Sequence, residues 1–155
     1  MLRRPRHASD IGTFDIMGSM RKTKIQSPRF AKRLGSYSHG YTVEIGDTNL
    51  IFTTGQIALD PDGNVVYPND AAKQAEYIYQ ALGTILEASG ATFDDVVKTT
   101  IFLTDMDDFP ALSPIRNKYF RNAEPVSTLV EVSRLVKPGC CVEIEAIAVT
   151  SRIHG

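Results

Sequence analysis

Two carboxylates share one face of the last hydrophobic run of the chain. Glu143 and Glu145 are separated by one apolar residue within residues 141–150. Because side chains alternate between the two faces of a strand, both carboxylates point to the same side. An acid on a hydrophobic strand can move a proton or orient water if a pocket forms over it. An edge strand, or an ion pair with Arg134, explains the pattern without chemistry, and the pattern alone favours that explanation.

Two other groups of reactive side chains have structural explanations. Asp105, Asp107 and Asp108 precede a predicted helix, where the helix dipole favours acids, so they indicate a helix start more than a metal site. Cys140 and Cys141 are the only cysteines. Adjacent thiols cannot link distant segments and make a weak zinc site, so reduced thiols are predicted. The sequence therefore predicts no metal ligands.

The elements that position these residues follow from apolar spacing. Strands are predicted at 41–45 and 49–57, joined by a Gly46-Asp47 turn, and at 96–103, 126–135 and 141–150. Helices are predicted at 70–89 and near 109–120. The order ββαβαββ predicts an α+β fold with the helices on one face of a mostly antiparallel sheet. Leu129 and Val149 are expected on the uncovered face, which favours oligomerisation.

Charge divides the chain into a basic start and an acidic body. Residues 1–33 carry nine basic and two acidic side chains, and residues 34–155 carry eight basic and sixteen acidic ones. An acidic body repels phosphate backbones, so nucleic acid is disfavoured as a partner. No apolar run approaches the ~18 residues of a membrane span, so no membrane partner is expected.

The first twenty residues lack the apolar periodicity of the remainder. We expect residues 1–20 to be an unstructured extension and residues 21–155 to form a single domain. An over-long start, an added extension and an organelle transit peptide all fit the opening segment. The expected compartment is the cytoplasm, or a mitochondrion or another organelle if the segment is a transit peptide.

Four blocks of sequence, in order along the chain, resemble the RidA/YjgF family. They are residues 35–39 (GSYSH), 50–57 (LIFTTGQI), 96–105 (VVKTTIFLTD) and 142–148 (VEIEAIA), and the likeness runs from about Lys22 to Thr150. The resemblance implies a chorismate-mutase-like homotrimer, with three sheets forming a central barrel and a small-molecule site at each interface. It also implies hydrolysis of reactive enamines or imines to 2-oxo acids and ammonia, without a metal or organic cofactor.

The resemblance also implies which residues form the site. Tyr37 matches a pocket tyrosine and Glu143 an acid that helps orient water, so both are predicted catalytic residues. Residues 54–56 (Thr54, Gly55, Gln56) match a ligand-binding turn. This chain departs from the family at two binding positions, with Ser113 in place of an Asn and Ser127 in place of the Arg that binds the substrate carboxylate. A hydroxyl cannot form the bidentate charged pair, so binding is expected to weaken about tenfold to a hundredfold.

Three functions follow, in decreasing order of support. The first is an enamine or imine deaminase with an altered substrate, for example one without a carboxylate. The second is a metabolite-binding or regulatory protein that uses the same inter-subunit cleft without catalysis. The third is an endoribonuclease or translation inhibitor, a label that family members also carry. The acidic body and the lack of a paired-histidine site or of interleaved basic and aromatic residues disfavour the third.

Overall fold

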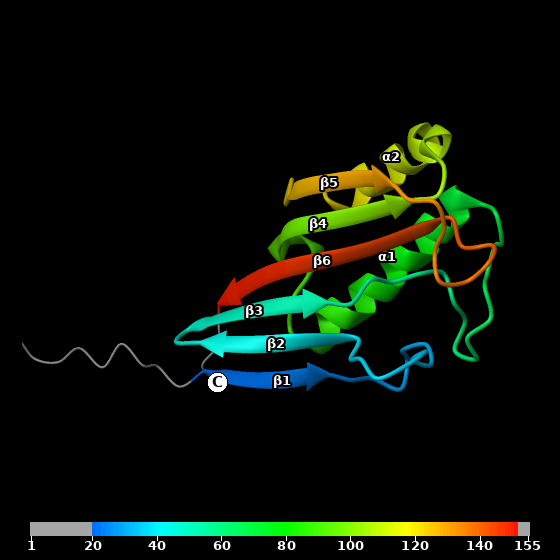
Figure 1. Cartoon of the computed structure of the whole chain (residues 1–155). Helices are drawn as coiled ribbons and strands as arrows, with labels where there is room; N and C mark the ends of the chain where they lie inside the picture. Colours follow the sequence, from blue (N-terminus) through cyan, green and yellow to red (C-terminus); the bar gives the residue numbers. More distant parts are fainter. Residues whose placement is uncertain (1–19, 152–155) are drawn as a thin grey trace, which may run out of the picture.

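The computed structural model describes residues 20–151, which form one six-stranded sheet with two helices on one of its faces (Figure 1). The strands are β1 (Arg21–Ile25), β2 (Gly40–Ile45), β3 (Thr48–Thr53), β4 (Val96–Leu103), β5 (Val126–Glu131) and β6 (Val142–Ser151). The helices are α1 (Ala71–Ala88) and α2 (Phe109–Tyr119), with short 3-10 turns η1 (Phe93–Asp95) and η2 (Met106–Asp108). The extension predicted at 1–20 lies, as far as residue 19, outside the described residues.

The sheet has the strand order β1-β2-β3-β6-β4-β5. Neighbouring strands are antiparallel except for β4 and β5, which are parallel, so the predicted α+β class with a mostly antiparallel sheet is confirmed. β6, which carries Glu143 and Glu145, is hydrogen-bonded to β3 on one side and to β4 on the other. The edge-strand explanation of the two carboxylates is therefore wrong.

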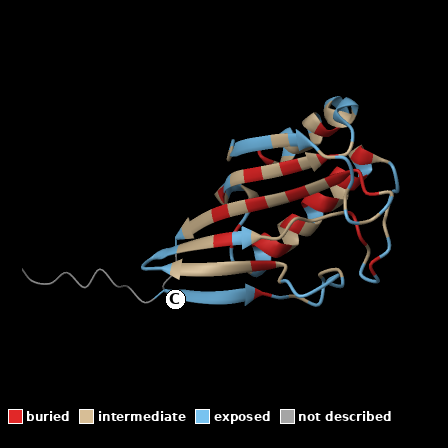
Figure 2. Ribbon diagram, viewed as in Figure 1, coloured by how far each residue is buried: buried red, intermediate tan, exposed pale blue. Residues whose placement is uncertain are grey.

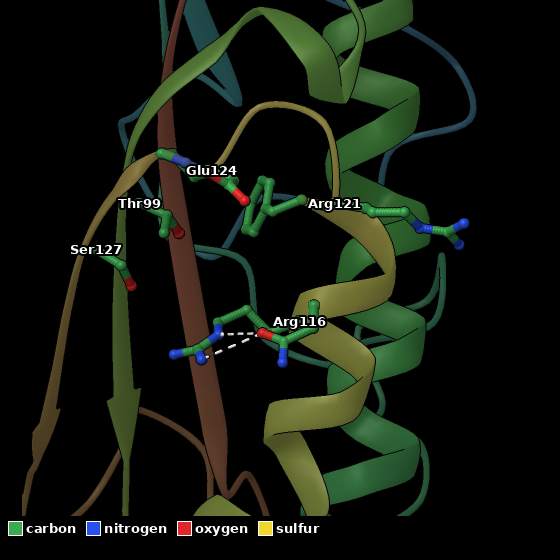
Figure 3. Close-up of a pocket in the computed structure, with 8 residues that line it drawn as sticks. Thr99, Arg116, Arg121, Glu124 and Ser127 are labelled. Carbon is green, nitrogen blue, oxygen red and sulfur yellow. Dashed lines mark hydrogen bonds between the residues drawn. The ribbon is translucent and has the colours of Figure 1, made fainter.

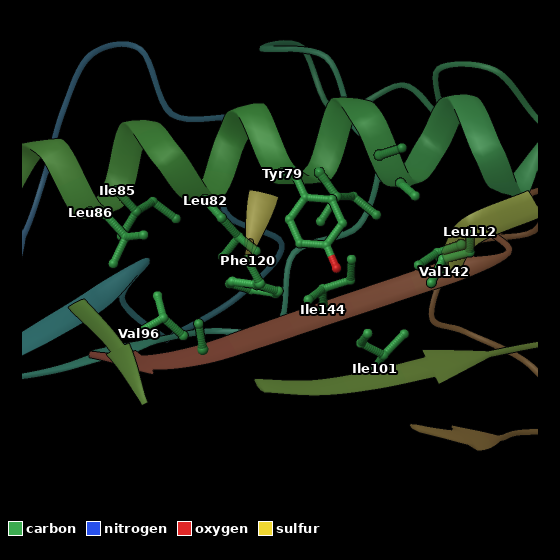
Figure 4. Packing of buried hydrophobic residues seen from close by; sticks show 14 of the residues in the cluster. Tyr79, Leu82, Ile85, Leu86, Val96, Ile101, Leu112, Phe120, Val142 and Ile144 are labelled. Carbon is green, nitrogen blue, oxygen red and sulfur yellow. The ribbon is translucent and has the colours of Figure 1, made fainter. Parts of the chain in front are cut away.

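The helix α1 covers the centre of the sheet. The Asp70 carboxylate caps its start by accepting a hydrogen bond of 3.0 Å from the Lys73 backbone N–H, and the chain leaves the helix through Ser89 and Gly90, whose φ is +76°. The predicted helix at 70–89 is confirmed. Its buried face packs mainly on β6, with β3 beside it (Figures 2 and 4). This face consists of Ala71, Gln74, Ala75, Ile78, Tyr79, Leu82, Ile85 and Leu86. Neither helix in the described part of the chain is long and apolar enough to cross a membrane.

Three strands differ from their predicted form. β3 ends at Thr53, short of the predicted 49–57. β1 was not predicted, because it has the sequence RKTKI and only Ile25 is buried. It pairs with β2 at the sheet edge, where charged side chains are common, so apolar alternation gives no signal there. β5 ends at Glu131, short of the predicted 126–135.

The register of β5 decides which of its side chains face the helices. Leu129 pairs with the fully buried Ile101 in the parallel register and packs against the core, so the expectation that Leu129 lies on the uncovered face is wrong. Val149 pairs with Leu50 on the opposite, uncovered face. The pairings place further apolar side chains, all exposed or half-buried, on that face: Tyr41, Val43, Phe52, Phe102, Val130 and Ile147. A broad apolar sheet face therefore lacks a cover within one chain.

Candidate functional site

Tyr37 lies in the loop that joins β1 to β2, and the loop folds on itself around this side chain. The Tyr37 hydroxyl oxygen accepts a hydrogen bond of 3.0 Å from the Leu34 backbone N–H, and the Arg33 guanidinium donates to the Tyr37 carbonyl. The Tyr37 ring meets His39 edge-on, with 6.4 Å between the ring centroids. Because the hydroxyl oxygen is used as an acceptor, its proton is available to a ligand.

The segment Thr54-Gly55-Gln56 follows β3 and crosses towards β6. The Thr54 backbone N–H donates to the His39 carbonyl (2.9 Å). Gln56 exchanges two backbone hydrogen bonds with Ile144, of 2.9 and 3.0 Å. These bonds hold Gly55 directly against the Glu143 side chain, where any added Cβ would overlap the carboxylate and lie 2.8 Å from its carbon. Only glycine allows this approach.

Glu143 is half-buried on β6, on the face of the sheet opposite the helices. Burial raises the pKa of its carboxyl group, and the neighbouring Glu145 raises it further. Within residues 20–151 its carboxylate has no hydrogen-bond or ion-pair partner, and Arg134 does not pair with it. A desolvated, unpaired carboxylate is a stronger base when ionised than one in water, and it is free to bind water or a ligand.

These residues line one cavity of about 250 Å³. It brings together Tyr37, Thr54, Gly55, Gln56 and Glu143, five of the seven site residues expected from the sequence, with His39 beside them. Burial lowers the pKa of His39, and the nearby Arg33 lowers it further, which favours the neutral imidazole at neutral pH. The cavity thus offers a phenol, a neutral imidazole and a carboxylate.

The other two expected site residues lie elsewhere. Ser127 is on the edge strand β5, where it pairs with Thr99 and faces the helices, so within one chain it lies on the opposite face of the sheet from Glu143. It lines a second cavity, of about 490 Å³, between α2 and the strands (Figure 3). Ser113 is half-buried on α2 and is not among the residues that line either cavity.

The second cavity contains a cation that the sequence did not point to. Arg116 extends from α2 towards Ser127 and Thr99 (Figure 3). A signal existed in the sequence, because Arg116 follows Ser113 by three residues and therefore lies on the same side of the predicted helix. Arg134, which the sequence offered as an ion-pair partner for the two carboxylates, lines neither cavity.

The remaining reactive groups have structural roles. The Asp105 carboxylate accepts from the Asp107 backbone N–H (2.9 Å) at the turn before α2, which confirms the helix-start explanation. No cluster of three or more His, Cys, Asp or Glu side chains in the described part of the chain could hold a metal ion. Cys140 and Cys141 are free and buried, and burial raises the pKa of both thiols, which disfavours the reactive thiolates.

Comparison with known proteins places this chain in a family. Residues 30–150 match the family profile described as Endoribonuclease L-PSP. Protein DfrA of Myxococcus xanthus is 40% identical over 134 residues, which cover 86% of this chain and 100% of that protein. The mouse 2-iminobutanoate/2-iminopropanoate deaminase is 35% identical over 133 residues, covering 86% of this chain and 95% of the relative. The crystal structure of YEO7 from yeast has 35% identity and a TM-score of 0.75, with 85% of this chain and 99% of that chain covered. The chain belongs to the RidA/YjgF, or Endoribonuclease L-PSP, family.

Proposed function

We propose that this protein hydrolyses imines, and the enamines that tautomerise to them, to a carbonyl compound and ammonia. The observation that carries the proposal is the unpaired, half-buried Glu143 carboxylate held against Gly55 in the same cavity as Tyr37. The name of the mouse relative, an iminobutanoate and iminopropanoate deaminase, supports the same reaction class. Ser127 supports a substrate range that differs from that of relatives with an arginine there.

The reaction requires only water and proton transfers. Water adds to the imine carbon while one of its protons passes through Glu143 to nitrogen, which forms a carbinolamine. A second proton then passes from the new hydroxyl through Glu143 to nitrogen, the C–N bond breaks and ammonia leaves. The Tyr37 hydroxyl is placed to donate to the reacting molecule, and Glu143 returns to its starting charge.

The direct experiment supplies freshly generated 2-aminoacrylate and follows pyruvate and ammonia release. We expect the protein to accelerate pyruvate release well above the rate in buffer. A rate equal to that in buffer, for this enamine and for a neutral imine without a carboxylate, would remove the proposal.

The clearest structural test of the site concerns the contact between Gly55 and Glu143. Gly55→Ala is expected to lower kcat/KM about a hundredfold, since displacing a catalytic group by about 1 Å costs that much. Gly35→Ala is the matched control, because the nearest atom to its added Cβ, on the Tyr37 ring, is 3.9 Å away. Steady-state kinetics on both variants, with thermal unfolding as a check on folding, measures the effect. Equal rates for the two variants would mean that the contact has no role.

We further propose that the site is completed in a homotrimer. Within one chain, Glu143 and Ser127 face opposite sides of the sheet, so a ligand that contacts both must lie between two copies. The uncovered apolar face supports such an assembly, since Phe52 and Val130 remain 40% and 39% exposed in the single chain.

A charge on the uncovered face is expected to break this assembly. The unmodified protein should have a mass in light scattering of about three times the 17.1 kDa of one chain. Phe52→Lys should reduce it to the mass of one chain and abolish the activity, because a buried unpaired charge is costly. Met106→Lys, at an exposed apolar position before α2, is the control and should leave the mass unchanged. A monomeric unmodified protein would contradict the proposal.

Ser127 also supports a second function, a metabolite-binding protein without catalysis. In that case a small molecule should raise the unfolding temperature although 2-aminoacrylate and the neutral imine are not hydrolysed. The effect should vanish in Tyr37→Phe and in Glu143→Ala. Ligands that still bind to both variants would show that this cavity is not the site.

A further inference from the structure

The cavity beside Ser127 holds an arginine without an acidic partner. The Arg116 guanidinium donates only to the neutral Asn117 side chain, through Nε (3.3 Å) and Nη2 (3.2 Å). Its central carbon lies 5.6 Å from the centre of the Phe109 ring. None of the ion pairs in residues 20–151 includes Arg116. The guanidinium is therefore held in place but not neutralised, and its remaining N–H groups can bind an anion.

The direction of the side chain supports a ligand between α2 and the sheet. Figure 3 shows the Arg116 guanidinium on the side of α2 that faces β4 and β5, near Ser127 and Thr99. Arg121 lines the same cavity, but its guanidinium extends to the other side of α2, away from Ser127. Of the two arginines, Arg116 is therefore directed into the cavity and Arg121 is directed away from it.

The neutral groups around Arg116 complete a site for a small acid. The Ser127 hydroxyl has no hydrogen-bond partner among residues 20–151, so it can donate to a ligand oxygen. Thr99 is fully buried, and its hydroxyl is already committed as a donor to the Glu145 carbonyl (3.1 Å). A guanidinium and one adjacent hydroxyl match the two oxygens of a carboxylate.

Glu124 restricts the charge of the ligand. It lines the same cavity without forming an ion pair to Arg116. Its negative charge repels anions, and the repulsion is stronger for a dianion than for a monoanion. The cavity therefore favours a carboxylate over a phosphate.

We propose that Arg116 binds the carboxylate of the small-molecule ligand, in the space that the short side chain of Ser127 leaves open. Only the identity of the ligand rests on the proposed function. If the protein hydrolyses imines, the ligand that Arg116 binds is a 2-imino acid, or its 2-oxo acid product, and not a substrate without a carboxylate. Ser127 is then a neutral hydrogen-bonding group beside the guanidinium.

The test is equilibrium binding of pyruvate and of its neutral analogue pyruvamide to the full chain, by calorimetry or ligand-observed NMR. The unmodified protein is expected to bind pyruvate at least tenfold more tightly than pyruvamide. Arg116→Gln should weaken pyruvate binding about tenfold to a hundredfold, and Arg116→Lys should weaken it less, because it keeps the charge without the fork. Arg121→Gln is the matched control and should change binding less than twofold. Glu124→Gln should strengthen it. Thermal unfolding of each variant checks folding.

Two results would overturn the inference. One is equal affinity for pyruvate and pyruvamide, or no binding of either. The other is equal pyruvate affinity in folded Arg116→Gln and in the unmodified protein. Pyruvate binding that depends on Arg116, without hydrolysis of 2-aminoacrylate or of the neutral imine, would sustain this inference and reject the proposed reaction. Hydrolysis of 2-aminoacrylate with the same kcat/KM in Arg116→Gln and in the unmodified protein would support the proposed reaction and reject the role of Arg116.

Discussion

Glu143→Gln is expected to lower kcat for imine hydrolysis about 10²- to 10⁴-fold, the range typical of a residue that transfers protons. The amide has the size of the carboxylate and can still hydrogen-bond to water, but it cannot accept a proton. Glu145→Gln is the matched control, two residues along the same face of β6, and should retain most of the activity. A similar kcat for Glu143→Gln and the unmodified protein would remove Glu143 from the reaction.

The pH dependence gives an independent readout. If the ionised form of Glu143 accepts the proton, kcat rises as pH increases through the Glu143 pKa, which burial and then Glu145 hold above its ordinary value of 4.5. Removing the Glu145 charge lowers that pKa, so the rise in Glu145→Gln should move to lower pH. An unmoved profile would show that the rise reports another group.

The same raised pKa has a consequence for stability. The folded chain binds the Glu143 proton more tightly than the unfolded chain does, so the contribution of Glu143 to stability is fully present below pH 4.5 and is lost as pH rises through the folded-state pKa. Glu143→Gln should therefore unfold at a higher temperature than the unmodified protein at pH 7, and the difference should shrink at pH 4. Asp62→Asn, which removes an exposed carboxylate, should show no such pattern.

Gln74→Leu is expected to reduce the free energy of unfolding by about 3 kcal/mol, the cost of one orphaned donor and the lost hydrogen bonds around it. Gln74 is fully buried on α1. Its Nε2 donates to the carbonyls of Tyr67 (3.0 Å) and Gly139 (2.7 Å), and its Oε1 accepts from the Cys141 backbone N–H (2.7 Å). Leucine fills the space but leaves the Cys141 N–H without a partner.

This cluster also ties Cys141 to α1, and Cys141 comes directly before β6 and two residues before Glu143. We therefore expect folded Gln74→Leu to lose activity as well as stability. Gln80→Leu, exposed on the same helix, should change stability by less than about 0.5 kcal/mol. Chemical denaturation of both variants measures the difference. A decrease in the free energy of unfolding below about 1 kcal/mol in Gln74→Leu would show that the hydrogen bonds of the amide do not stabilise the fold.

The sequence predicted the elements well where one face of an element is buried. The apolar stripe of α1, the Gly46-Asp47 turn and β4 all lie at the predicted positions. For α1 and β4 the reason is that the spacing of apolar residues reflects which face of an element is buried. The strand β1 was not predicted because four of its five side chains are exposed. The structural role of Gln74 was not predicted, because a polar residue on an apolar stripe gives no indication of its hydrogen-bond partners. Those partners lie up to 67 residues away in the sequence.

The candidate site likewise has a part that could be predicted from the sequence and a part that depends on the tertiary structure. The sequence by itself determined the α+β class through apolar spacing, and the family through four local motifs. The resemblance that these motifs carry pointed to five residues that line one cavity. Alternation along β5 and β6 shows which side chains share a face of their own strand. It does not show that Ser127 and Glu143 face opposite sides of the sheet, which only the register with β4 decides. The packing of α2 against the sheet likewise decided that Arg116 reaches the space beside Ser127, since the reach of a long side chain depends on the distance and angle between elements and not on the order of residues.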